Sequence, residues 1–170
     1  MHDAGVLRAR FMTVLQAGLV AGVLDISATM FLNVVILKQT TATELWQSLA
    51  SGLLGDVAYQ RGLETAVLGV ALHFTIALVW AAIFAVGRDQ LPALRRVAST
   101  GGMIAAGGVY GALVWLIMNF VVLRLSRASS DSLTDADFWA QLAIHMVCVG
   151  SPIALIVCRA RGQDRAAITA

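Results

Sequence analysis

Three ionisable residues of this sequence, Asp25, His73 and His145, stand inside long apolar stretches. A carboxyl group within a membrane span is costly and commonly marks an ion or substrate pathway. Histidine titrates near neutral pH, so it can exchange protons or bind a cation. Two imidazoles and one carboxyl can also ligate a metal ion. The sequence therefore offers a proton relay, a cation site or a metal site at these residues.

A tightly bound metal is the weakest of these interpretations. The three residues come from three different stretches and lack the H-E-x-x-H or H-x-x-E-H spacing of zinc enzymes. Neither Ser27 nor Ser151 stands in a nucleophile elbow or a Ser/Lys pair. We assign no catalytic residue, expect no cofactor, and keep Asp25, His73 and His145 only as weak metal candidates.

Two asparagines, Asn33 and Asn119, join the same set as candidate binding or proton-relay residues. Given the helix rise, both are expected at the same end of the protein as His145, with His73 and Asp25 nearer the middle. Amides inside a membrane often form hydrogen bonds between helices, worth about 0.6 kcal/mol each. That structural role is the alternative to solute binding for both asparagines.

The elements that must position these residues are four apolar stretches. A helix rises about 1.5 Å per residue and the hydrocarbon core is about 30 Å thick, so roughly 20 residues span it. The stretches cover residues 11–37, 63–87, 97–123 and 138–158. Charged residues make up 13% of the chain, whereas soluble domains contain about 25%. We predict an all-α, four-helix transmembrane bundle that forms one integral membrane domain over residues 1–170.

The connection between the first two stretches has a helical pattern of its own. Residues 44–54 follow amphipathic spacing, with Thr43 as the expected N-cap and with Gly52 and Gly55 expected to end the helix. This pattern predicts a short interfacial helix with Trp46 and Tyr59 at headgroup level. A helix packed over the mouth of the bundle is the alternative.

An internal similarity relates the two halves of the chain. Residues 33–38 align with 119–124, and residues 71–74 align with 143–146. The similarity predicts two duplicated hairpins related by an axis along the membrane normal. Asp25 breaks the repeat, since the equivalent position in the second half is a glycine.

The basic residues predict the orientation of the chain. Of twelve Lys and Arg residues, eight lie in the two termini and the middle connection, and four lie in the other two connections. Cytoplasmic loops carry the excess of Lys and Arg, so both termini are expected in the cytoplasm. No basic run accompanies aromatic residues, so a nucleic-acid partner is not expected. The expected partners are the lipid bilayer and a small-molecule or ion ligand of unknown identity. A second copy of the chain is also expected, because four helices line only a narrow passage.

Five short segments of the chain carry a family resemblance: 51–55 (SGLLG), 71–74 (ALHF), 118–123 (MNFVVL), 144–146 (IHM) and 150–153 (GSPI). They resemble segments of small, uncharacterised four-span bacterial inner-membrane proteins, and the resemblance covers about residues 16–159. More distantly, the layout resembles YagU-type inner-membrane proteins. The resemblance implies an inner-membrane location and a four-span topology, and it implies no activity. The YagU-type pattern lacks an acid matching Asp25, so the resemblance assigns that residue no role.

These observations lead to three functional hypotheses. The first is a non-enzymatic membrane protein that moves or senses a small solute or protons through the Asp/His cluster. The second is a structural or assembly protein whose polar residues only hold helices together, and the third is an intramembrane metal-dependent enzyme. Asp25, His73 and His145 should face the interior of the bundle, because ionisable groups facing lipid are costly, and Asn33 shares the inward face of Asp25.

Overall fold

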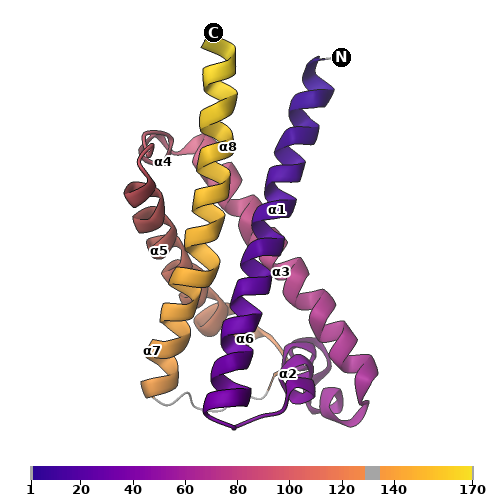
Figure 1. The fold of residues 1–170 in the computed structure, drawn as a ribbon. Helices are drawn as coiled ribbons and strands as arrows, with labels where there is room; N and C mark the ends of the chain where they lie inside the picture. Colours follow the sequence, from indigo (N-terminus) through magenta and orange to yellow (C-terminus); the bar gives the residue numbers. More distant parts are fainter. Residues whose placement is uncertain (1, 129–134, 170) are drawn as a thin grey trace.

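The computed structural model describes residues 2–128 and 135–169, and over these residues it contains helices and connections without strands (Figure 1). Four long apolar helices pack as a bundle, as predicted from the sequence. Their segments are, in order, α1 (His2–Met30) with π-helix η1 (Phe31–Ile36); α3 (Leu63–Gln90); α5 (Thr100–Ile117) with π-helix η3 (Met118–Val122) and α6 (Leu123–Leu125); and α7 (Asp135–Ile144) with π-helix η4 (His145–Gly150) and α8 (Ser151–Thr169).

The stretches long and apolar enough to cross a membrane are Ala4–Ile36, Leu63–Gln90, Thr100–Leu125 and Asp137–Gln163. They match the four predicted spans in number and order. The third begins at Thr100 instead of residue 97, because the Ser99 side chain accepts a hydrogen bond from the Gly102 amide at 3.1 Å and caps the helix there.

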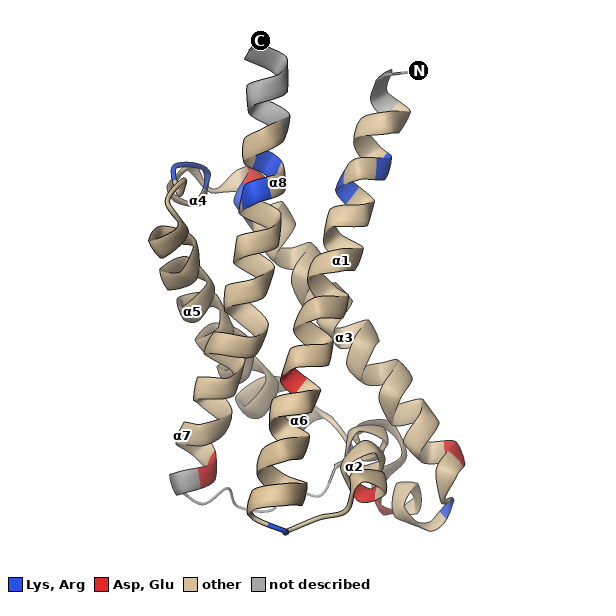
Figure 2. Ribbon diagram, in the orientation of Figure 1, with Lys and Arg blue, Asp and Glu red and all other residues tan. Residues whose placement is uncertain are grey.

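The exterior of the long helices is apolar, and most charges gather near the two ends of the bundle, with one acid, Asp25, inside α1 (Figure 2). Leu63, Val109 and Val147 are each at least 67% exposed on the outside of the helices. Exposed apolar surface on this scale requires a lipid environment. The chain is therefore a candidate multi-pass membrane protein with four spans in contact with the bilayer.

Helix α2 (Ala42–Leu54) and the 3₁₀ helix η2 (Gly55–Gln60) connect the first two spans. A capping box begins α2: the Thr41 hydroxyl accepts from the Glu44 amide at 3.2 Å, and the Glu44 carboxylate accepts from the Thr41 amide at 2.8 Å. The predicted cap, Thr43, was wrong, because extended backbone lies at Thr41 and Thr43 is already in the first turn. The helix ends before Gly55, as expected, where φ is +64°.

Helix α2 packs over the bundle, which is the alternative that the sequence left open. Gly69 of α3 contacts the carbonyl of Trp46 so closely that no side chain fits between them. At the other side of α2, the Arg127 amide donates to the Gly52 carbonyl at 3.0 Å. Trp46 packs edge-on against the His73 ring, with centroids 5.9 Å apart, while Tyr59 is 44% exposed. The level of these rings relative to lipid headgroups stays a prediction.

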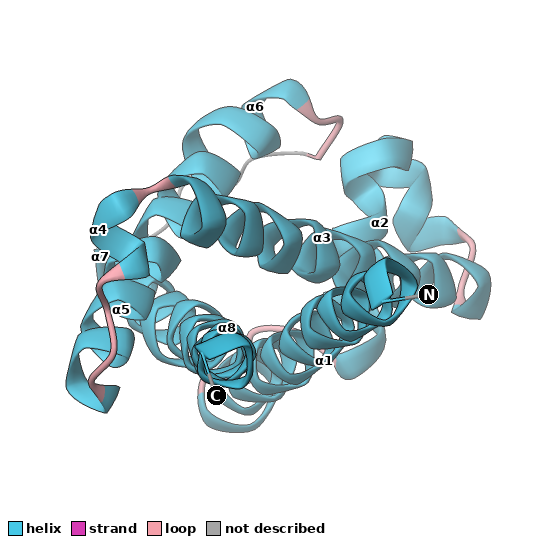
Figure 3. Cartoon of the chain, turned by 90° about the horizontal axis from the view of Figure 1, so that it is seen from above, coloured by secondary structure: helices cyan, strands magenta, loops and turns pink. Residues whose placement is uncertain are grey.

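Glycines set the closest contacts between the third and fourth spans. Gly111 contacts the His145 carbonyl, and Gly150 contacts the Gly107 carbonyl, without room for a methyl group at either position. The fourth span packs in turn on α1, and α1 packs on α3 (Figure 3). These contacts place the turn that begins at His145 directly between α5 and α1.

Candidate functional site

A cavity of about 550 Å³ lies between the long helices at the end opposite the chain termini. All five polar residues predicted as candidates line it: Asp25, Asn33, His73, Asn119 and His145. The rest of the wall is mostly apolar and includes residues of α2. The prediction that Asp25, Asn33, His73 and His145 face the interior of the bundle is confirmed, and Asn119 faces it as well.

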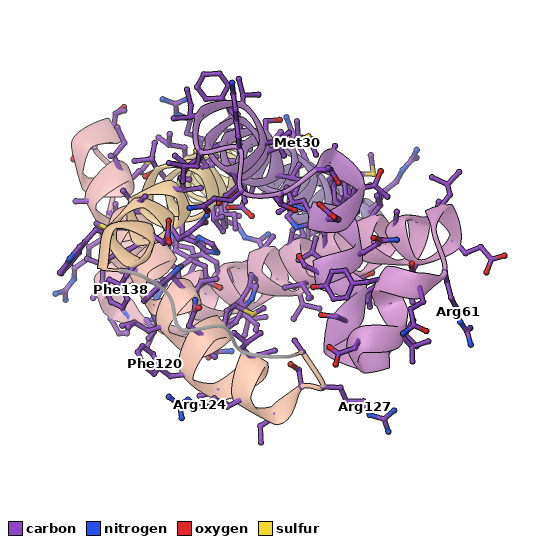
Figure 4. All side chains as sticks on the ribbon, turned by 90° about the horizontal axis from the view of Figure 1, so that it is seen from below. Met30, Arg61, Phe120, Arg124, Arg127 and Phe138 are labelled. Carbon is purple, nitrogen blue, oxygen red and sulfur yellow. The ribbon has the colours of Figure 1, made fainter. Side chains whose placement is uncertain are left out.

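The cavity reaches the surface where the first span meets α2. Gln39 and Ser48 line it and are both exposed. Figure 4 views this end of the molecule from below, with Met30 labelled near the end of α1 and Phe138 at the start of the fourth span.

Asp25 and His145 face one another across the contact between α1 and η4. Their atoms Oδ1 and Nδ1 are 3.8 Å apart, and their side chains are 15% and 19% exposed. That distance suits an ion pair but exceeds hydrogen-bond length. Among the residues that the structure describes, Asp25 Oδ1 is buried and has no hydrogen-bond partner. A buried oxygen without a donor is energetically costly, so a donor that reached it would stabilise the protein.

The N–H of His145 is directed to its own helix. Nδ1 lies 2.9 Å from the Gln141 carbonyl oxygen. A carbonyl only accepts, so in this bond Nδ1 carries the hydrogen. In the neutral ring the other nitrogen, Nε2, is then left as an acceptor.

His73 ties the second span to the first. Its Nε2 donates to the Gly22 carbonyl of α1 at 2.9 Å, and the residue is 9% exposed. The helices approach closely here, because a methyl group on Gly22 would lie 2.9 Å from the Phe74 ring. In the neutral form this bond leaves Nδ1 of His73 as an acceptor.

The two asparagines have the same local geometry. Asn33 Nδ2 donates to the Thr29 carbonyl and Asn119 Nδ2 donates to the Trp115 carbonyl, each at 2.9 Å and each within a single helix. Neither bond is the interhelical link that the structural hypothesis expected. The matching geometry agrees with the proposed repeat, although His73 bonds another helix and His145 bonds its own. The duplication therefore stays a prediction.

Each π-helical segment carries one of the candidate residues: Asn33 in η1, Asn119 in η3 and His145 in η4. Such turns are rare and occur frequently at functional sites. Sequence reasoning missed them. The only sequence signal is in η4, which ends directly before the Ser151–Pro152 pair, where Ser151 Oγ donates to the Met146 carbonyl at 2.8 Å.

Sequence reasoning also missed the contribution of α2 to the cavity wall. Leu45, Ser48 and Leu49 line the cavity together with Thr40. The helical spacing of the two leucines predicted an apolar face for α2 but not the surface that this face covers.

The weak metal candidates do not come together as a ligand set. Over residues 2–128 and 135–169, no group of three His, Cys, Asp or Glu side chains is placed to hold one ion. Asp25 and His145 are neighbours, whereas His73 is bonded to the Gly22 carbonyl.

Towards the chain termini the cavity ends at a closely packed apolar core. Ala17, Ala81 and Ile153 are completely buried there, and Phe84 is 2% exposed. The Tyr110 hydroxyl donates to the Trp80 carbonyl at 2.6 Å and joins α5 to α3 at this level. The cavity is therefore open at one end and closed at the other.

No protein-family model, no curated protein and no solved structure matches this chain. Four candidate membrane spans enclose the cavity that holds Asp25 and His145.

Proposed function

We propose that this chain is a multi-pass protein of the bacterial inner membrane that binds a small cationic or hydrogen-bond-donating solute, protons included, in the cavity between its spans. The observation that carries the proposal is Asp25, which lines this cavity and whose buried Oδ1 has no hydrogen-bond donor among the described residues. The inner-membrane location also follows from the resemblance to small four-span bacterial proteins.

The class of solute follows from the groups that remain available in the cavity. Each neutral histidine uses its N–H on a backbone carbonyl and keeps a ring nitrogen as an acceptor. Asp25 adds a carboxyl oxygen, and each asparagine keeps its amide oxygen. An excess of acceptors beside a negative charge favours an ammonium-type cation or a proton over an anion. Cavities of roughly 300–1,000 Å³ hold small molecules.

The distribution of charge supports an orientation with both termini in the cytoplasm. Both termini and α4 (Pro92–Arg95) lie at the same end of the bundle, and arginines gather there (Figure 2). Under the positive-inside rule that end is cytoplasmic. The cavity would then open to the outer side of the membrane.

The closed end of the cavity favours sensing over transport in this conformation. A solute entering beside Gln39 would meet the core around Phe84 and Ile153 before it reached the cytoplasmic end. Transport would require a second conformation in which this core opens, or a passage completed by another copy of the chain. Binding and sensing require neither.

The experiment is thermal unfolding of the purified protein in a nonionic detergent, with methylammonium as the probe and acetate as the matched anion. Methylammonium is expected to raise the unfolding temperature of the wild type, since a ligand at about 100 times its Kd stabilises a protein by about 2.7 kcal/mol. Asp25→Asn should lose this response, while Glu64→Gln, an exposed acid at the start of α3, should keep it. The proposal is contradicted if methylammonium leaves the unfolding temperature of the wild type unchanged, or if it raises that of Asp25→Asn as much as that of the wild type.

Proton flux into vesicles separates transport from sensing. A potassium gradient with valinomycin drives protons into vesicles that contain a pH-sensitive dye. Flux above that of protein-free vesicles, lost in Asp25→Asn, would support transport. Methylammonium binding without flux would support sensing.

The second candidate function is a structural or assembly role. It is favoured by the bond from His73 to the Gly22 carbonyl, which joins two spans. If the cavity residues are purely structural, His73→Gln should lower the unfolding temperature and no probe solute should change it.

A further inference from the structure

A second cavity, of about 490 Å³, lies at the end of the bundle that holds the termini. Three arginines line it from three elements: Arg88 at the end of α3, Arg95 in α4 and Arg159 in α8. None of the described residues that line it is acidic. We call this cavity the arginine pocket.

Arg88 is the unusual member of the arginine pocket, because it is a buried charge with no counter-ion among the described residues. The residue is only 4% exposed. Its Nη2 donates to the Arg95 carbonyl at 3.1 Å, and its Nε is buried with no hydrogen-bond partner among the described residues.

The nearest acid in the sequence does not neutralise Arg88. The Asp89 carboxylate lies 3.0 Å from Arg161 and 3.9 Å from Arg10. No ion pair of Arg88 occurs within the part of the chain that the structure describes. A buried guanidinium is costly unless an anion pairs with it. The arginine pocket is therefore incomplete without a negative group.

Two further features suit an anion. The helix α5 begins at Thr100, between the lining residues Ala98 and Met103, so the positive end of its dipole is at the arginine pocket. The apolar lining residues Val97 and Met103 also provide a surface beside the arginines that an acyl chain can contact.

We propose that the arginine pocket binds a phosphate group, carried by an anionic phospholipid headgroup or by free phosphate. Guanidinium groups match the oxygens of phosphate in charge and in bidentate geometry. Basic pockets between membrane helices are suited to anionic headgroups. This site is separate from the Asp25 cavity and does not depend on the proposed function.

The test measures thermal unfolding of the delipidated protein in nonionic detergent, titrated with three probes: phosphatidylglycerol, phosphatidylcholine and inorganic phosphate. Stabilisation by phosphatidylglycerol alone would identify a lipid site, and equal stabilisation by inorganic phosphate would identify a free-phosphate site. Stabilisation by neither, or by phosphatidylcholine as strongly as by phosphatidylglycerol, would overturn the proposal.

Three variants connect this response to the arginine pocket. Arg88→Met keeps the buried stem and removes the charge, and Arg159→Gln removes a charge that is exposed to solvent. Arg96→Gln is the matched control, since Arg96 is exposed and does not line the arginine pocket. The first two should weaken the apparent affinity about tenfold or more, and the control less than about twofold. If Arg88→Met fails to fold, the apparent affinity of Arg159→Gln alone tests the proposal. An equal loss in Arg96→Gln would show unspecific attraction to surface charge and overturn the proposal.

Discussion

His145 and Asp25 lie with Nδ1 and Oδ1 3.8 Å apart, yet the imidazole N–H is directed to the Gln141 carbonyl and not to the carboxyl group. Asp25 is thus beside a histidine without accepting a hydrogen bond from it. A purely structural carboxyl would be expected to pair with the donor beside it. The arrangement leaves one buried carboxyl oxygen, at the wall of the cavity, without a donor among the described residues.

Asp25→Asn should therefore leave the empty protein as stable as the wild type, or raise its free energy of unfolding by about 1–3 kcal/mol. The substitution removes a buried carboxyl that lacks a donor and keeps the shape of the side chain. Thermal unfolding in detergent without added solute measures the effect, with Glu64→Gln as the control. A loss of more than about 2 kcal/mol would mean that the ion pair with His145 holds the spans together.

Gly111→Ala should destabilise the protein by about 1–3 kcal/mol. The added methyl group would overlap the His145 carbonyl and lie 2.7 Å from the Met146 Cα atom. At Gly108, on the same helix, the nearest atom to an added methyl group is the Met146 Cε at 3.7 Å, which is ordinary contact. Gly108→Ala is therefore the matched control, with a neutral or slightly stabilising effect. Equal effects of the two variants would show that α5 does not pack on η4 as described.

Asn33→Ala and Asn119→Ala should each cost about 0.5–1.5 kcal/mol, and the two costs should be similar. Each asparagine satisfies a carbonyl four residues earlier, near a π-helical turn. Chemical unfolding of the single and double variants measures both costs and their additivity. A clear cost at one position and none at the other would argue against equivalent hairpins.

The start of α2 should weaken in acid. Hydrogen bonds from the Thr41 amide and then the Thr41 hydroxyl hold the pKa of Glu44 below its ordinary value of 4.5. Because the folded-state pKa is the lower one, this stabilisation is complete above pH 4.5 and is lost as pH falls through the folded-state pKa.

Hydrogen exchange of the first α2 amides, corrected for the intrinsic rate, should show this loss of protection below pH 4.5. Glu44→Gln keeps a capping side chain that does not titrate, so its protection should not change with pH in this range. The same loss in Glu44→Gln would assign the pH dependence to another group.

The sequence predicted those features that depend on composition and helical period. The four spans follow from apolar length, and the end of α2 follows from Gly55. The inward direction of Asp25 and Asn33 follows from the cost of placing polar groups in lipid.

The remaining features depend on contacts between segments far apart in the chain. Nothing local in the sequence places the carbonyl of Trp46 against Gly69, or brings Arg88 beside Arg159. The π-helical turns at Asn33 and Asn119 each contain an extra residue. Because the neighbouring side chains are all apolar, the extra residue does not change the hydrophobic pattern and cannot be detected from it. The buried residues of the core that closes one end of the cavity are apolar like the rest of the spans, so the sequence does not distinguish them.

The most direct test of the account is the water accessibility of the cavity, measured with single cysteines at neighbouring positions of α1. Thr29 lines the cavity, whereas Ser27, two residues earlier, is exposed and does not line it. In a chain carrying Cys148→Ala and Cys158→Ala, a membrane-impermeant cationic thiol reagent is added from the side opposite the termini. Rapid labelling of Thr29→Cys and negligible labelling of Ser27→Cys are expected, because thiols react as thiolates and need water. Equal labelling of the two positions, or labelling of Ser27→Cys alone, would contradict an open polar cavity inside the bundle.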